Sequence, residues 1–143
     1  MASGIKFEFK GFDEMLENIQ NADGSIKSSV DNAMKESSKI VYNELKNQMS
    51  RSGPKPVDSA LINRLPAPVI TWEGNYCSAK VGYKKGSYDP NNLSDGFKAV
   101  FINYGTPRIS PREFIKATKK KAAPQVKKKQ KQVLSDILKE LQT

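Results

Sequence analysis

Apolar side chains near the start of the chain follow two different periods. In residues 5 to 10, apolar and charged side chains alternate, which predicts a half-buried strand. Residues 12 to 19 then carry apolar side chains at the spacing i, i+3, i+4 and i+7. This spacing predicts a short amphipathic helix that ends near Gly24.

The longest periodic segment follows directly. From Ser25 onward, the side chains that would share one helix face continue for about seven turns. They are Ile26, Val30, Ala33, Met34, Ser37, Val41, Leu45 and Met49. Ser25 can cap the start of this helix, and Gly53 and Pro54 must end it because proline cannot continue a helix. We therefore expect one long helix that offers an apolar face to the rest of the fold.

A hairpin and a further strand are predicted in the second half of the chain. Residues 69 to 72 and 76 to 83 are rich in β-forming side chains. The Gly74-Asn75 pair between them suits a two-residue turn, since glycine tolerates a positive φ. Residues 97 to 104 combine aromatic and β-branched side chains, so they are predicted as a third strand of this region.

Two stretches that are rich in turn-forming residues, 51 to 66 and 84 to 96, are predicted as protruding surface loops. The first has room for at most a turn and a half of helix, around residues 58 to 63. The two loops would flank the hairpin on either side in the sequence.

The last part of the chain predicts a helix with an interruption. Residues 110 to 113, Ser-Pro-Arg-Glu, match a capping box with Pro111 at the first helical position. Pro124 lies within the following apolar pattern, where it removes a backbone donor and clashes with the preceding turn. We expect a kinked helix in two pieces, about 111 to 123 and 124 to 141.

These elements predict an α+β fold, in which a small antiparallel sheet of three to four strands packs against a long helix, with a kinked basic C-terminal helix. A chain of 143 residues can bury one substantial core without disulfides or a structural metal. We expect residues 1 to 110 to form the body, and residues 111 to 143 to form a basic helical segment of the same domain.

Charge is distributed very unevenly. Residues 1 to 106 hold 13 basic and 12 acidic side chains, whereas residues 107 to 143 hold 11 basic and 3 acidic ones. Almost all of the net charge of +9 therefore lies in the last quarter of the chain. A basic arm of this kind meets phosphates, an acidic protein surface or only water.

The chemistry of the side chains argues against an enzyme. The chain has no histidine, and its single cysteine, Cys77, lies in a predicted strand where a buried, inert thiol is expected. We also expect no metal and no cofactor, because neither a phosphate loop nor a calcium loop has its required spacing. The start of the chain lacks the apolar segment of a signal peptide, and no window is long and apolar enough for a membrane span, so we expect a soluble protein made in the cytoplasm.

A cluster of lysines is the clearest candidate site. No acidic residue lies among its members, which are Lys116, Lys119, Lys120, Lys121, Lys127, Lys128, Lys129 and Lys131. Such a cluster can bind phosphates without regard to base sequence, or it can be a solvated helix face. Because no aromatic side chain lies among these lysines, any nucleic-acid contact should be limited to the backbone.

The order of motifs points to a known family. GFDEMLENI is followed by KIVYNELKNQM, by a Ser-Gly-Pro loop leading to DSALINRL, by the hairpin, and by an aromatic segment that ends in Tyr104-Gly105-Thr106. Phe114 then follows a proline and begins the last helix. This layout resembles the small neck proteins of long-tailed bacteriophages, which are described as head-tail joining, head-tail connector or tail-completion proteins. Two departures are that Asn103 replaces the usual acid, and that one extra residue separates Pro111 from Phe114.

The resemblance implies a non-enzymatic virion protein that assembles as a ring at the portal-tail junction. Its partners would be further copies of itself and other neck, portal or tail proteins, with non-specific contact to packaged DNA and no membrane. The residues it marks for docking subunits or partners are Tyr104, Gly105, Thr106, Pro107, Pro111 and Phe114. The lysines would face the DNA or an acidic neighbouring ring.

Two other functions are compatible with the residues. In one, the lysine-rich helix makes the chain a sequence-independent nucleic-acid-binding protein. In the other, scattered aspartate and glutamate residues hold metal ions in a nuclease.

Overall fold

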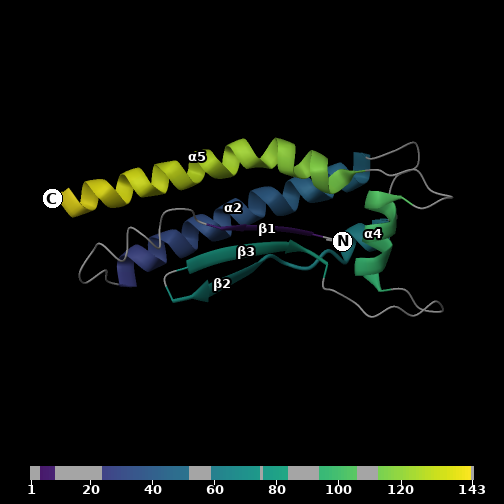
Figure 1. The fold of residues 1–143 in the computed structure, drawn as a ribbon, viewed down its shortest axis with the longest axis horizontal. Coiled ribbons are helices and arrows are strands. Elements are labelled where there is room, and N and C mark those ends of the chain that lie inside the picture. Colours follow the sequence, from purple (N-terminus) through teal and green to yellow (C-terminus); the bar gives the residue numbers. More distant parts are fainter. Residues whose placement is uncertain are drawn as a thin grey trace.

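Two long helices and a three-stranded sheet make up most of the described structure (Figure 1). The computed structural model describes residues 4–8, 24–51, 59–74, 76–83, 94–105 and 113–142. The long helices are α2, Gly24–Arg51, and α5, Phe114–Gln142, which pack side by side and run in opposite directions. The strands are β1, Gly4–Glu8, β2, Val69–Glu73, and β3, Tyr76–Gly82. Two short helices, α3, Ser59–Asn63, and α4, Asp95–Tyr104, complete the described elements.

The sheet is antiparallel with the strand order β1-β3-β2, so the predicted strand at residues 5 to 10 and the predicted hairpin are both present. Gly74 has a φ of 60°, the positive value that the hairpin turn was expected to need. Ile5 pairs with Val81, and Phe7 pairs with Ala79, which places these apolar side chains on the same face of the sheet. That face carries the core, while Lys80 on the opposite face is exposed.

The core lies between the sheet and the helices. α2 packs on β3 through the apolar face that the sequence predicted, and Val30, Met34, Leu45 and Met49 on that face are each 0% exposed. Full burial of side chains of this size stabilises the fold by roughly 1.5 to 3 kcal/mol each. α5 also contributes buried side chains at both ends of the core, so the basic segment is part of the same packed body.

The predicted surface loop at residues 51 to 66 is partly wrong. Its short helix exists as α3, but Leu61 and Leu65 are buried, at 2% and 4% exposed. The hydroxyl of Tyr83, at the end of the hairpin, donates a hydrogen bond of 2.5 Å to the carbonyl oxygen of Leu61. The prolines and polar residues of this stretch predict a loop, but the two leucines lie four residues apart, a helical spacing, and both pack into the core.

The predicted strand at residues 97 to 104 is wrong, because this segment forms the helix α4. Gly96, Ala99 and Asn103 are buried, and their spacing of three and four residues is helical. Asp95 in the first turn accepts two hydrogen bonds of 3.0 Å from the Arg64 guanidinium, in a geometry that suits the positive end of the helix dipole. Aromatic and β-branched composition predicted a strand, but spacing and tertiary packing decide the outcome.

The predicted capping box at residues 110 to 113 does not begin the last helix, which begins at Phe114 instead. Glu113 precedes it with a φ of 47°, and its N–H donates to the carbonyl oxygen of Asn103 over 3.0 Å. The Asn103 side-chain oxygen accepts the N–H of Ile115, also at 3.0 Å. A residue of α4 therefore supplies the N-terminal cap of α5.

α5 is one helix and is not split in two at Pro124. Its axis changes direction partway along its length (Figure 1), as expected where a proline removes one backbone hydrogen bond. Ala122 and Val126 are buried on either side of Pro124, so packing keeps both halves of the helix in place. The predicted helix at residues 12 to 19, residues 52 to 58 of the first predicted loop, residues 84 to 93 of the second and residues 106 to 112 lie outside the described residues.

The first prediction concerns the cap of α5. Asn103→Ala should lower the free energy of unfolding by about 1 to 2 kcal/mol, because it leaves the buried N–H of Ile115 without its acceptor. Asn103→Asp keeps an acceptor of the same shape and should lose less than half as much. Urea unfolding measured by far-UV circular dichroism compares the two variants, and equal losses would show that the acceptor does not matter.

The second prediction concerns the contact between α2 and β2. The indole N–H of Trp72 donates to Asp31 over 3.1 Å, and this hydrogen bond, followed by the one from Lys35, lowers the pKa of Asp31 below its ordinary value of 3.8. The ionised carboxylate thus favours the folded state, with a contribution that is present above about pH 4 and is lost as the pH falls from there through the lower folded-state pKa. Asp31→Asn should flatten the fall in stability below about pH 4, as measured by Trp72 fluorescence during urea unfolding. Asp136→Asn on α5 is the control, and an identical profile for both variants would contradict the assignment.

Candidate functional site

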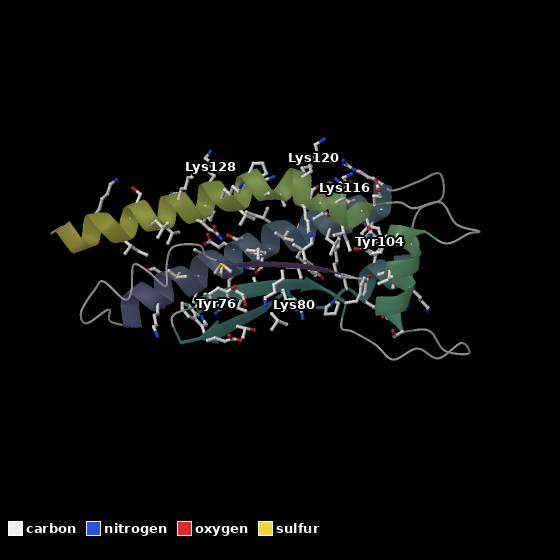
Figure 2. The ribbon with its side chains drawn as sticks, in the orientation of Figure 1. Tyr76, Lys80, Tyr104, Lys116, Lys120 and Lys128 are labelled. Carbon is white, nitrogen blue, oxygen red and sulfur yellow. The ribbon has the colours of Figure 1, made fainter. Side chains whose placement is uncertain are left out.

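The corner between α4 and α5 contains the residues that were predicted to dock subunits or partners. Tyr104 ends α4 and is 46% exposed, at the end of the molecule where α4 lies (Figures 1 and 2). Gly105 follows with a φ of 79°, the left-handed conformation that glycine adopts without strain. This confirms that the turn uses a backbone conformation that is costly for residues with a Cβ. Thr106, Pro107 and Pro111 lie outside the described residues.

The inner side of the corner is firmly anchored. Phe114 is 1% exposed and belongs to the main core cluster, so its side chain anchors α5 within the protomer. Thr118, one turn further along, is fully buried and donates to the carbonyl oxygen of Phe114 over 2.7 Å. Together with the Asn103 cap, these contacts fix the direction in which α5 leaves the corner. Tyr104 is therefore an exposed aromatic side chain on a rigid support.

The lysines of α5 divide into two groups. Lys121 and Lys129 reach carboxylates on α2: Lys121 lies 3.8 Å from Glu44, and Lys129 lies 2.5 Å from Glu36. The hydrogen bond from Lys129 lowers the pKa of Glu36. The other six are exposed and have no carboxylate within 4 Å among the described residues. They are Lys116, Lys119, Lys120, Lys127, Lys128 and Lys131.

Four of these exposed lysines form a row, which we call the lysine row: Lys116, Lys120, Lys127 and Lys131. Their spacing of four, seven and four residues places them within an arc of about 60° on the helix, over a length of about 22 Å. Figure 2 shows Lys116 and Lys120 of this row, and Lys128 beside it, pointing away from the sheet. The row points outward because another side of α5, with Ile115, Ala122 and Val126, is buried. Lys127 lies at the border of the row and also lines a groove beside α5.

A groove that the sequence did not reveal lies between β1 and α5. Its volume is about 660 Å³, and its lining includes Ile5, Phe7, Ala122 and Val126, with Lys6, Lys119 and Lys127 among the other contributors. The residues come from segments more than one hundred positions apart, so no local pattern predicts it. The only signal in the sequence is the Ala122-Ala123 pair, two small side chains that leave room beside the helix.

The single cysteine is buried, and the acidic residues of the described chain do not gather into a metal site. Cys77 is 1% exposed, as expected, and burial followed by the nearby Asp31 charge raises its pKa to about 11, so it remains a thiol at neutral pH. No three His, Cys, Asp or Glu side chains gather where they could hold a metal ion in the described part of the chain. Within the same part, none of the helices has the length and apolar character that crossing a membrane requires.

Three surfaces of the described structure are suited to binding: an exposed aromatic corner, a row of lysines and an apolar groove. The corner and the groove are each formed where two or more elements meet, and the row lies along α5. A scan of protein-family models, a search of curated proteins and a search of solved structures each found no match to this chain.

Proposed function

We propose that this protein is a structural component of the neck of a tailed phage or prophage particle. It would join the head, on the portal side, to the tail or complete the tail, as one subunit of a ring around the path of the DNA. The proposal is supported by the order of sequence motifs, and one observation carries it furthest: the exposed Tyr104-Gly105 corner is rigidly supported by Asn103 and Phe114.

A rigid exposed aromatic residue is well suited to an interface. Aromatic side chains contribute large contact areas at a small entropic cost, and tyrosine is enriched among the residues that dominate binding energy. Tyr104 and Val69 are the large apolar side chains that remain exposed among the described residues. Tyr104 is the one that also lies beside a left-handed glycine and a cross-helix cap, so its position is well defined before any partner binds.

The lysine row gives this subunit a second role within such a ring. A surface that surrounds a moving duplex needs positive potential without tight, base-specific contacts. Lysine suits this role because it is a flexible point charge, whereas arginine forms bidentate contacts with phosphate. The row would line the DNA path or face an acidic neighbouring ring.

A second function is favoured by the same row considered alone. Exposed lysines along about 22 Å of helix, without carboxylate partners among the described residues, would let the chain act as a sequence-independent nucleic-acid-binding protein. In that case the corner would be no more than a connection between two helices.

The third prediction tests the corner. Tyr104→Ala should weaken association with a portal or tail protein encoded beside this chain by at least tenfold, because truncating a central aromatic residue at an interface costs about 2 kcal/mol or more. Light scattering of the mixed proteins measures the mass of the complex. Val69→Ala, which truncates the other exposed apolar side chain, is the matched control. A chain that stays monomeric at high concentration with every such partner would contradict the neck proposal.

The fourth prediction tests the row. Replacing Lys116, Lys120, Lys127 and Lys131 by Gln should abolish duplex binding at low salt if the row contacts phosphates. Removing the same number of charges outside α5, at Lys39, Lys46, Lys80 and Lys98, should leave most of it. Four phosphate contacts predict a fall of roughly a hundredfold in affinity between 50 and 200 mM salt. Fluorescence anisotropy with a labelled duplex measures both effects, and equal losses from the two sets of variants would show that only net charge matters.

A further inference from the structure

The groove between β1 and α5 opens along the edge of the strand. Three consecutive β1 residues line it: Ile5, Lys6 and Phe7. Successive side chains of a strand point to opposite faces, so side chains alone would bring only alternate residues to a hollow above one face. Contact with all three places the groove beside the backbone of β1.

That edge of β1 is a free edge within the described part of the chain. In the sheet order β1-β3-β2, β1 pairs with β3 on one side and with no other described strand. Alternate N–H and C=O groups of an edge strand point outward and can pair with an added strand. The groove therefore exposes hydrogen-bonding groups along one wall.

The opposite wall is a regular stripe of α5. Its lining residues begin at Lys119 and recur at alternating intervals of three residues and one residue up to Gln130, which places them on one side of the helix for three turns. The rise of α5 from Lys119 to Gln130 is about 17 Å. An extended segment of about five residues has the same length.

Charge and polarity indicate what this groove would bind. Its floor is apolar, with Ile5, Val41, Ala122 and Val126 among the contributors, and three lysines line it as well. Those lysines, Lys6, Lys119 and Lys127, have no carboxylate within 4 Å among the described residues. The positive charge that these lysines bring to the groove complements an acidic segment better than another basic surface, such as α5 of a second copy.

We propose that the groove binds an extended segment of a partner protein in which acidic and apolar residues alternate. The segment would add a fourth strand beside β1, with its apolar side chains on the Ile5 and Val126 floor and its carboxylates near Lys119 and Lys127. This surface is separate from the Tyr104 corner, and the proposal does not depend on where in a particle the protein acts.

The experiment uses the full chain and a synthetic probe. The labelled peptide Glu-Val-Glu-Val-Glu-Val-Glu should bind with a Kd below about 100 μM in fluorescence anisotropy. The same peptide with alternate backbone nitrogens methylated should bind at least tenfold more weakly, because it cannot pair with a strand edge. A peptide with Lys in place of Glu should not bind.

Two matched pairs of variants locate the binding. Lys119→Glu with Lys127→Glu should weaken peptide binding at least tenfold, while Lys120→Glu with Lys128→Glu makes the same charge change on the outer face of α5 and should have less than a threefold effect (Figure 2). Ala123→Trp should block the groove, whereas Gln132→Trp, at another exposed position of α5, should not. Circular dichroism confirms that each variant is folded.

Three results would overturn the proposal. The first is that the peptide fails to bind the full chain at 1 mM, which would mean that the groove is closed or covered in solution. The second is that both charge-reversal pairs weaken binding equally, which would mean that only net charge attracts the peptide. The third is that Ala123→Trp abolishes self-association of the chain, which would assign the groove to a second copy.

Discussion

The packing of α5 along α2 is the interaction on which the rest of the structure depends. α2 alone can cover β3, but α5 supplies buried side chains to both ends of the core, from Phe114 near the corner to Ile137 near the chain end. One side of α5 is buried against α2 and the rest of the core, so its lysines lie on the side that remains exposed. The outward direction of the lysine row is thus a consequence of core packing.

The same packing creates the groove and fixes the corner. α5 lies beside β1 without closing on it, since Ala122 and Ala123 leave space where larger side chains would fill it. At its other end, the position of α5 on α2 brings Ile115 within reach of the Asn103 side chain. Neither feature can form in isolated segments, because each needs two elements that are distant in the sequence.

Local patterns in the sequence predicted those features of the fold that depend on a single helix, strand or turn. The α+β class, the hairpin with its Gly74 turn, the long face of α2 and the buried Cys77 all follow from periodicity and residue type. The errors at α4 and at the start of α5 have one physical cause. Composition and a capping motif are local signals, whereas packing against distant elements decides whether residues 97 to 104 form a helix or a strand and where α5 begins. In the sequence, Asn103 is only a departure from a motif; its role as the cap of α5 appears once α4 and α5 lie together. The groove is formed by distant segments, so local sequence patterns hardly predict it.

The departure at Asn103 also bears on the proposed function. In the neck-protein motif from which the proposal starts, an acid is usual at this place, and an acid offers the same kind of acceptor at a helix start as asparagine does. In this chain the acceptor is buried and ties Ile115 to the end of α4, immediately before the exposed Tyr104. Asparagine at this position therefore holds the corner in a fixed geometry, which is the feature on which the proposed docking at Tyr104 relies.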